Sequence, residues 1–487
     1  MAKQKKTNNK TQTKDCSSDT VTFIIMGGGG DLSIRKLIPA IYNLLEKKTI
    51  TNCSVVLTAR SPRKAAQVLT KAKKYIKKVK VSTWNKLVSC AIYHQMDFSN
   101  PGDYQKLDKV IQKQETKLKL CGNRIFYLAT IPQNFNIITK NLARTKTIRN
   151  TKTHSSKVVY EKPFGDNYKS AKSINKSLKK HFTEKQVYRV DHYLEKELVS
   201  NIGLLRFTNR ILEPLFSHKH IESIQIIINE KLDVQKRGRF YDNYGALKDV
   251  VQNHALQLLA LTCMGAPKRL DGEHIRASKA KFLKSLMIKD FFLGQYEGYK
   301  NTKGVTKNSK TETFAAVKLI SKERRWENVP FFIKTGKALK EKRTLIQIKF
   351  KPVKCLLDYC PSETNHLTIN IDPVDNIHFH LNSKVPNSHQ KVAPVKLNFS
   401  QKANFNINTP KAYQILLEDD IKGDQSVFVR SDEIEFAWKV IDKIEDLRKK
   451  PNKKYPHQNK LYTYKKGASS PEELGAWNKK HKIKWTA

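Results

Sequence analysis

The chain has 487 residues, more than one ordinary hydrophobic core holds, which predicts two or three domains of about 100–200 residues each. Hydrophobic residues make up 39% of it, so a chain that is disordered throughout is excluded, as is a single small binding module. The 92 Lys and Arg outnumber the 44 Asp and Glu, giving a net charge of +48. Nucleic acid, anionic membranes and small phosphorylated molecules are therefore candidate partners.

The positive charge is spread along the chain. Residues 1–20 are rich in Lys, Asn, Thr and Ser with almost nothing to bury, which predicts a disordered basic tail with a net charge of only +3. A diffuse excess favours a solvated lysine-rich surface over a nucleic-acid groove.

The cysteines and the N-terminus indicate the compartment. Seven cysteines form an odd set without a CxxC pair, which argues against a disulfide framework and a zinc cluster and favours reduced thiols. The N-terminus lacks the apolar region of a signal peptide, and no stretch approaches the roughly 18 apolar residues of a spanning helix. We expect a soluble, cytoplasmic protein that does not contact a membrane.

Strands and helices alternate in the first part of the chain. Residues 21–26 predict a buried strand, the glycines at 27–30 a tight turn and residues 32–45 a helix; strands at 53–58 and 124–129 and a helix at 61–76 follow. This alternation predicts an α/β, Rossmann-like domain over residues 21–190, with helices on both faces of a parallel sheet.

The pattern changes after residue 190. Strands predicted at 221–228, 345–350 and 367–371 are not separated by regular helices, whereas residues 245–264 predict one helix with an apolar face. We expect an α+β domain over residues 191–487 with a large, mainly antiparallel sheet.

A glycine-rich turn between a strand and a helix can bring the backbone close to a pyrophosphate. Here the run Gly27-Gly28-Gly29-Gly30 precedes Asp31 and Leu32. Alone, it is also compatible with a flexible turn. Arg60 follows the second predicted strand, where a guanidinium suits a 2′-phosphate, so the sequence favours NADP over NAD. The alternative for Arg60 is an ordinary surface cation.

Two further clusters carry ionisable groups. Residues 189–197 place Asp191, His192, Tyr193 and Lys196 within six positions, a set suited to a phosphate monoester, although a charged helix start is the alternative. On the predicted helix, His254 could be a proton acceptor or an ordinary histidine at the edge of a core.

Together these motifs resemble the glucose-6-phosphate dehydrogenase family over about residues 21–475. The matching residues are Gly27, Gly30, Asp31 and Leu32 of the coenzyme turn, Glu161-Lys162-Pro163-Phe164-Gly165, Asp191 to Glu197, Arg237-Gly238 with Asp242, and Gln252-Asn253-His254. The resemblance implies NADP-dependent oxidation of glucose 6-phosphate to 6-phosphoglucono-1,5-lactone, in the oxidative pentose phosphate pathway, by a homodimer or a dimer of dimers.

The resemblance also implies roles for individual residues. His254 would be the general base and Asp191 its partner, and Lys162-Pro163 would be a hinge. The substrate would be bound by Lys162, His192, Tyr193, Lys196, Glu230, Asp249, Lys337 and Lys342, and the coenzyme by Gly27, Gly30, Asp31, Leu32, Arg60 and Lys162.

Two positions depart from the family pattern. Glu195 replaces a glycine, so its carboxylate would either weaken phosphate binding beside Lys196 or point to solvent. Lys342 stands where many members have arginine, which keeps the charge but loses the bidentate fork. Whether a second, structural NADP binds stays open, since that site lies in the divergent C-terminal region.

Histidine and cysteine pairs elsewhere in the sequence are candidate metal ligands. The pairs His218 with His220 and His378 with His380 have strand spacing, but without neighbouring cysteines or paired carboxylates we expect no metal there, and the same applies to Cys355 and Cys360.

The alternative functions are a relative acting on another hexose phosphate or preferring NAD, and a basic nucleic-acid-binding protein on a dehydrogenase scaffold. We expect no specific nucleic acid partner.

Overall fold

The computed structural model describes residues 20–148, 155–354, 364–388, 391–400, 412–450 and 455–486. The chain forms two compact units. The first contains Met1–Tyr160 and Leu417–Gly423, and the second contains Glu161–Leu416 and Asp424–Ala487. The first division between these units comes after Tyr160. The domain boundary that we predicted from the sequence lies at residue 190, directly after the last strand of the parallel sheet, and that boundary stays a prediction.

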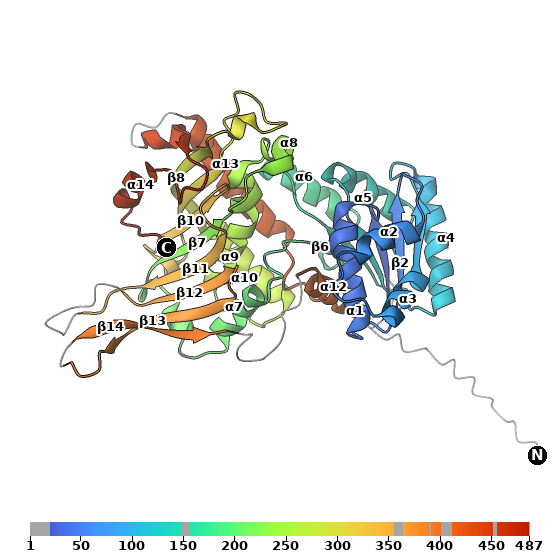
Figure 1. The fold of residues 1–487 in the computed structure, drawn as a ribbon, viewed down its shortest axis with the longest axis horizontal. Helices are drawn as coiled ribbons and strands as arrows, with labels where there is room; N and C mark the ends of the chain where they lie inside the picture. Colours follow the sequence, from blue (N-terminus) through green and yellow to red (C-terminus); the bar gives the residue numbers. More distant parts are fainter. Residues whose placement is uncertain are drawn as a thin grey trace, which may run out of the picture. The chain divides into compact units, whose positions relative to one another are not determined.

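The first unit is built around parallel strands (Figure 1). Its strands are β1 (Thr20–Met26), β2 (Asn52–Ala59), β3 (Ala91–Gln95), β4 (Arg124–Leu128) and β5 (Ser156–Tyr160). The pairs β1–β2, β1–β4, β2–β3 and β4–β5 are all parallel. The six-stranded order is β3-β2-β1-β4-β5-β6, where β6 is Val187–Arg189. The predicted parallel sheet is confirmed.

Helices connect these strands because each parallel pair needs a crossover. They are η1 (Ser33–Leu37), α1 (Ile38–Glu46), α2 (Ala65–Lys73), α3 (Val81–Cys90), α4 (Pro101–Leu118), η2 (Pro132–Asn134) and α5 (Phe135–Arg144). The α1, α2 and α3 helices contact one another, and α4 contacts α5. Strands β1, β2 and β4 are almost fully buried, as expected for continuous apolar runs covered on both faces.

The second unit contains a nine-stranded sheet in the order β14-β13-β12-β11-β7-β10-β9-β8-β15 (Figure 1). Its strands are β7 (Ile221–Asn229), β8 (Leu286–Tyr296), β9 (Phe314–Ser321), β10 (Phe331–Gly336), β11 (Arg343–Phe350), β12 (His366–Asp372), β13 (Asn376–Lys384), β14 (Val392–Phe399) and β15 (Tyr462–Tyr464). Among the described strand pairs of this second sheet, only β7–β10 and β8–β15 are parallel. The mainly antiparallel sheet is therefore confirmed.

Several helices of this unit pack together beside the sheet, namely α6 (Tyr168–Lys179), α7 (Glu197–Phe207), η6 (Leu247–Ala255), α9 (Leu256–Cys263), α10 (Gly272–Ser285) and α13 (Ser431–Lys449). The α14 helix (Leu474–Lys480) also belongs to this unit, whereas α12 (Ala412–Lys422) is divided between the two units. The short ones are η3 (Glu184–Gln186), η4 (Glu213–Leu215), η5 (Gln235–Arg237), α8 (Gly238–Tyr241), η7 (Tyr299–Asn301), η8 (Arg324–Trp326) and η9 (Pro456–Asn459). The η6 helix contacts β7, β10 and α13. It is therefore held between the sheet and the helical layer.

Some predicted bounds differ from the structure. The helix predicted at 61–76 is shorter, Ala65–Lys73, and both helices predicted at 32–45 and 245–264 open with a π-helical segment that apolar spacing does not reveal. Strand β1 begins at Thr20, and the rest of the predicted tail lies outside the described residues. In the described part of the chain, no helix has the length and apolar character to cross a membrane.

Candidate active site

The glycine turn at the end of β1 has the backbone that its sequence demands. Gly27 has φ of +102°, and a Cβ atom there would lie 2.3 Å from the carbonyl oxygen of Ala129, so only glycine fits. The amides of Gly27 and Gly28 both donate to the Thr58 carbonyl, at 2.8 and 2.9 Å. The turn is thereby tied to the carboxyl end of β2. Asp31 and Leu32 follow the turn directly, and Asp31 is exposed.

Two arginines stand near this turn. Arg60 directly follows the last residue of β2, as predicted, and it is exposed. Arg63, which our sequence reasoning missed, donates from Nη1 to the carbonyl oxygen of Gly29 at 3.0 Å. It lies three residues beyond Arg60 in a lysine-rich stretch, so only the fold distinguishes it. The Arg63 guanidinium therefore lies against the turn, whereas Arg60 is located by its place directly after β2.

The second unit contains a buried pair of Asp191 and His254. The Asp191 carboxylate Oδ1 lies 2.5 Å from Nδ1 of His254, and both side chains are 4% exposed. Although burial opposes ionisation, the adjacent His254 holds the pKa of the Asp191 carboxyl well below its usual range. Burial lowers the pKa of His254, which Asp191 opposes and the Lys162 ammonium reinforces. His254 is therefore neutral at neutral pH and Asp191 is ionised.

Lys162 determines which nitrogen of His254 carries the proton. Its Nζ lies 2.8 Å from Nε2 of His254 and 3.1 Å from the carbonyl oxygen of Asp249. An ammonium group can only donate, so Nε2 accepts and the proton of the neutral imidazole is on Nδ1, facing Asp191. Lys162 also begins the cis Lys162-Pro163 bond at the predicted hinge.

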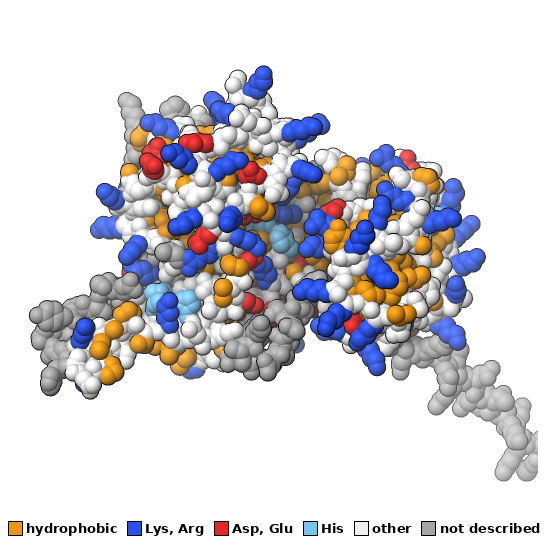
Figure 2. Space-filling view, viewed as in Figure 1, with side chains coloured by type: hydrophobic (Ala, Val, Ile, Leu, Met, Phe, Trp, Pro, Cys, Tyr) orange, Lys and Arg blue, Asp and Glu red, His pale blue; other side chains and the backbone are white. Residues whose placement is uncertain are grey.

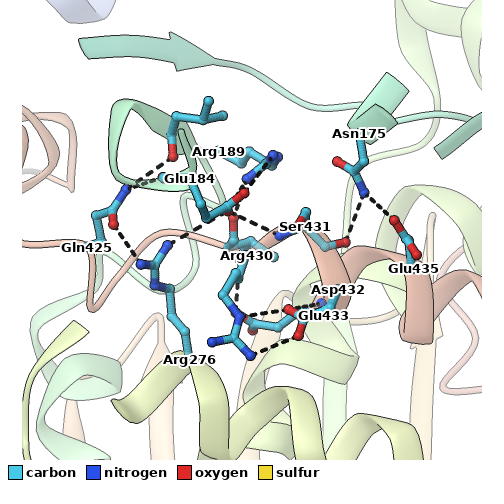
Figure 3. Close-up of polar contacts among 12 residues, drawn as sticks. Asn175, Glu184, Arg189, Arg276, Gln425, Arg430, Ser431, Asp432, Glu433 and Glu435 are labelled. Atoms are coloured by element: carbon cyan, nitrogen blue, oxygen red, sulfur yellow. Dashed lines mark hydrogen bonds and ion pairs between the residues drawn. The ribbon is translucent and has the colours of Figure 1, made fainter. Parts of the chain in front are cut away.

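A network of polar side chains anchors the segment that carries Asp191 (Figure 3). Arg189, two residues earlier and 1% exposed, donates to Glu184 at 2.5 Å, and its carbonyl accepts from the Val429 amide at 3.0 Å. Arg276 of α10 donates to Gln425, whose amide donates to the carbonyls of Glu184 and Val187. The strand end before Asp191 is thus fixed on two sides.

The rings beside His254 come from the same segment as Asp191. The Tyr193 ring stacks on His254 with centroids 4.3 Å apart, and the His192 ring meets it edge-on at 4.5 Å. Burial, reinforced by the nearby Lys162 ammonium, lowers the pKa of His192 well below its ordinary value. Burial raises the pKa of the Tyr193 hydroxyl. Both groups are uncharged at neutral pH and can act as hydrogen-bond donors.

Two lysines meet at one carboxylate next to these rings. Lys196 and Lys342 each place Nζ 2.9 Å from an oxygen of Asp372, and Lys196 lies over the Tyr193 ring at 5.1 Å. Burial opposes ionisation of Asp372, but hydrogen bonds from both lysines lower its pKa. The sequence identified both lysines but not Asp372, which lies in a strand of another region.

Glu230, Asp249 and Lys337 form a third group. The Lys337 ammonium pairs with Glu230, and its Nζ lies 3.9 Å from Oδ2 of Asp249. The other carboxylate oxygen of Asp249, Oδ1, lies 3.6 Å from Nζ of Lys162 and 3.8 Å from Nη2 of Arg237. These three cations outweigh burial and lower the pKa of Asp249. A pocket of about 670 Å³, counting the open space at its mouth, is lined by Glu230, Arg237, Tyr241, Lys337 and Lys342 among others. All the predicted substrate-binding residues thus lie in the second unit, around this pocket and the buried pair.

One of the two alternatives for Glu195 is excluded. The side chain does not point to solvent, because Glu195 is only 1% exposed. Its negative charge contributes, after burial and Glu161, to raising the pKa of the Tyr413 hydroxyl. Both carboxylate oxygens of Glu195 are therefore buried in the protein.

The histidine pairs have different settings. His218 and His220 lie in the turn before β7, so their one-residue gap does not place both rings on one face of a strand. His378 and His380 do lie on β13, where His380 stacks on His366 with centroids 3.9 Å apart. Cys355 and Cys360 lie outside the described residues.

Within the described residues, one group has the donors of a metal site, namely Asp191, His192 and His254, with ligand atoms within 4.8 Å of one another. Both ring nitrogens of His254 already face Asp191 and Lys162. The arrangement therefore favours proton transfer. On the face of the molecule shown in Figure 2, Lys and Arg side chains are dispersed over both units among few acidic groups.

Comparison with known proteins assigns the family. Residues 24–201 match the profile of the glucose-6-phosphate dehydrogenase NAD binding domain, and residues 203–486 match that of its C-terminal domain. The glucose-6-phosphate 1-dehydrogenase of Bacillus subtilis (strain 168) is 38% identical over 445 residues, covering 87% of this chain and 91% of that protein. The chloroplastic enzyme of Solanum tuberosum is 33% identical, covering 96% of this chain and 83% of its own.

Solved structures agree with this assignment. A glucose-6-phosphate dehydrogenase in complex with glucose 6-phosphate has a TM-score of 0.88 and 30% identity, over 96% of this chain and 99% of that chain. The Mycobacterium avium glucose-6-phosphate 1-dehydrogenase has a TM-score of 0.81 and 28% identity, over 96% and 98%. With both domain profiles matched and these relatives aligned over nearly their full length, the chain belongs to the glucose-6-phosphate dehydrogenase family.

Proposed function

We propose that this chain oxidises glucose 6-phosphate at C1 with NADP, giving 6-phosphoglucono-1,5-lactone and NADPH. The observation that carries the proposal is the buried hydrogen bond of 2.5 Å between Asp191 and Nδ1 of His254, in a chain of this family. It leaves a neutral imidazole whose other nitrogen can accept a proton. Oxidation of an alcohol to a carbonyl requires removal of one proton and one hydride, and this pair supplies the acceptor for the proton.

His254 acts as the general base through Nε2. The C1 hydroxyl takes the place of the Lys162 ammonium as hydrogen-bond donor to this nitrogen, and its proton passes to Nε2 as the C1–H bond breaks. Asp191 then stabilises the imidazolium through Nδ1. Because burial lowers the pKa of His254, the base is unprotonated at neutral pH and ready for the transfer.

Lys196, with His192 and Tyr193, binds the 6-phosphate. In the structure Asp372 holds the ammonium groups of Lys196 and Lys342 at 2.9 Å each, and this preorganises two cations for a dianion. His192 and Tyr193 add neutral donors, since the pKa of His192 is lowered and that of Tyr193 is raised. Lys342 supports the phosphate as a point charge, without the fork of an arginine.

Glu230, Asp249 and Lys337 bind the sugar hydroxyls. Asp249 is on the same helix as His254, so a sugar held by Asp249 is presented to the base by one rigid element. Lys162 contacts His254 and Asp249 together and orients the reacting end of the sugar.

The first unit has the donors that NADP requires. The turn at Gly27–Gly30 places backbone amides at the start of a helix, where a pyrophosphate is stabilised, and Asp31 and Leu32 continue from it. Arg60 and Arg63 supply guanidinium groups that suit a 2′-phosphate. NADP, when bound, accepts the hydride from C1.

A homodimer accompanies this function. Strand β14 is at the edge of the nine-stranded sheet, and Leu381, Val395 and Leu397 of β13 and β14 are 38%, 40% and 57% exposed. Val395 pairs with Leu381 and Leu397 is two residues further along, so the three side chains share a face. An exposed apolar row on a sheet is a typical dimer surface. We assign this face to a second copy of the chain, in the cytoplasm.

The direct test is NADPH absorbance on mixing the purified chain with glucose 6-phosphate and NADP. We expect turnover with this pair, and much weaker turnover with other hexose phosphates or with NAD. Absence of turnover with glucose 6-phosphate while another hexose phosphate reacts would refute the substrate assignment. Light scattering of the wild type and of Leu397→Asp tests the dimer, since the aspartate would place a charge in the apolar face.

A further inference from the structure

A buried carboxylate is positioned at the start of the helix that carries Asp249 and His254. Glu312 is 3% exposed and belongs to the segment before β9. Its Oε1 accepts a hydrogen bond from the Leu247 amide at 3.1 Å, and its backbone carbonyl accepts from the Ala246 amide at 3.0 Å. The residue preceding the helix supplies no side-chain cap of its own. Glu312 therefore satisfies the first amides of this helix from a distant part of the chain.

The fit at this contact is close. Gly245 has φ of +65°, and a Cβ atom on it would lie 2.3 Å from Oε1 of Glu312. The turn before the helix therefore has no room for a side chain while the carboxylate occupies its site. The backbone entering the helix and the Glu312 side chain are packed against each other, so a displacement of one moves the other.

Arg448 of α13 completes the contact. Its Nη1 lies 3.0 Å from Oε2 of Glu312, and its other amino group donates to the Lys310 carbonyl. One oxygen of Glu312 thus faces the helix and the other faces Arg448. Burial raises the pKa of the Glu312 carboxyl, and the Arg448 guanidinium opposes this shift.

The same segment also reaches the sugar-binding group. The Thr313 carbonyl accepts from the Lys337 amide at 2.9 Å, and Thr311 donates to the Asp242 carbonyl at 2.6 Å. Lys337 is the lysine that lies 3.9 Å from Asp249. A short stretch of chain around Glu312 therefore contacts both the helix of Asp249 and the backbone of Lys337.

We propose that Glu312, paired with Arg448, is a positioning residue that sets the placement of Asp249 and His254 relative to Lys337. It touches neither substrate nor coenzyme and acts through the Leu247 amide. The inference rests on the proposed function for its kinetic readout. It predicts that loss of the carboxylate disturbs the sugar-binding group while leaving the glycine turn and Arg60 unchanged, because those groups lie in the other unit.

Glu312→Gln tests this with the full chain, because it keeps the shape but removes the charge. We expect the KM for glucose 6-phosphate to rise about tenfold, with the KM for NADP unchanged. Arg448→Met should likewise raise the KM for glucose 6-phosphate and leave the KM for NADP unchanged. Arg448→Lys should raise the KM for glucose 6-phosphate less. The matched control is Glu222→Gln, which breaks a half-exposed pair with Lys349 at 2.9 Å. Lower thermal stability of the Glu312 variant with both KM values unchanged would overturn the proposal.

A second measurement does not depend on activity. Amide hydrogen exchange, followed by mass spectrometry of the folded full chain, should accelerate in residues 246–255 of Glu312→Gln and not in the control. Unchanged exchange there would overturn the proposal even if the wild type does not oxidise glucose 6-phosphate. If Glu312→Gln does not fold, Arg448→Met carries both tests, because Arg448 is 20% exposed at the edge of the contact.

Discussion

Asp191→Asn removes the charge of the proposed catalytic pair while keeping its shape. The Asp191 carboxylate is 2.5 Å from Nδ1 of His254, and both side chains are nearly inaccessible to water. When His254 takes the proton from substrate, an imidazolium forms beside this carboxylate. Two opposite charges about 4 Å apart attract by about 4 kcal/mol at an effective dielectric constant of about 20. Asparagine cannot supply this attraction, although its amide can still bond to the ring.

The expected loss follows from that energy. Because each 1.4 kcal/mol or so corresponds to a factor of ten, kcat should fall about 10²–10³-fold in Asp191→Asn. Affinity for glucose 6-phosphate should change little, since Lys196 and Asp249 remain. His254→Asn removes the proton acceptor itself and should lower turnover by about 10²–10⁴-fold or more, again with substrate still bound.

Steady-state NADPH formation and calorimetric binding of glucose 6-phosphate measure the two effects separately. The pH profile adds a third readout, because Asp191 raises the pKa of His254 whereas burial and Lys162 lower it. Activity of the wild type should therefore persist to a pH below the ordinary histidine value, and in Asp191→Asn the acid limb should move to still lower pH. A variant whose kcat stays within about threefold of the wild type would refute the assignment of the pair.

Coenzyme choice, phosphate affinity, stability and surface charge have separate tests. Arg60→Ala should raise the KM for NADP about 10–100-fold more than that for NAD, and equal losses would contradict its assignment to the 2′-phosphate. Lys196→Ala should chiefly weaken glucose 6-phosphate binding in calorimetry, with kcat affected less. Asp290 is fully buried and lies 2.7 Å from both His457 and His481, so Asp290→Asn should cost about 3–5 kcal/mol in urea unfolding. The pKa of Asp290 is depressed, so its contribution to wild-type stability is present above the ordinary Asp pKa and is lost as pH falls through the folded value. Duplex DNA binding, measured by fluorescence anisotropy, should be weak and vanish steeply as salt rises; tight binding at physiological salt would show a second function.

The sequence predicts best the parts of the fold whose signal is local. Strand β1, the glycine turn and the following helix each appear in consecutive residues, because apolar runs, glycine and helical spacing are local properties. The motifs of the candidate site are local as well. Asp191 and His254 were therefore both identified, although 63 positions separate them and only the fold brings their side chains together.

Residues that act across the chain leave no such signal. Glu312 and Arg448 meet over 136 positions, and neither stands in a motif, so nothing in the local pattern separates them from other charged residues. In the sequence, Arg63 does not differ from the many other cationic residues, and only the fold shows that it donates a hydrogen bond to the Gly29 carbonyl. Glu195 does stand in a motif, but the motif does not show whether its side chain is buried. Its position beside a lysine did not reveal whether it faces solvent, because burial depends on how the whole chain folds around it.

The net charge of +48 says little about the chemistry of the site, because charges there are paired. Asp372 balances Lys196 and Lys342, while Asp249 and Glu230 face Lys162 and Lys337. Under the proposed function, a sugar phosphate that enters this group would bring its own negative charge to lysines that are already held in place, so its binding would cost little reorganisation. On the face shown in Figure 2, Lys and Arg side chains are spread over the outer surface, where water and salt screen them. Affinity for the phosphate should therefore depend on the geometry of these few pairs far more than on the total charge of the protein.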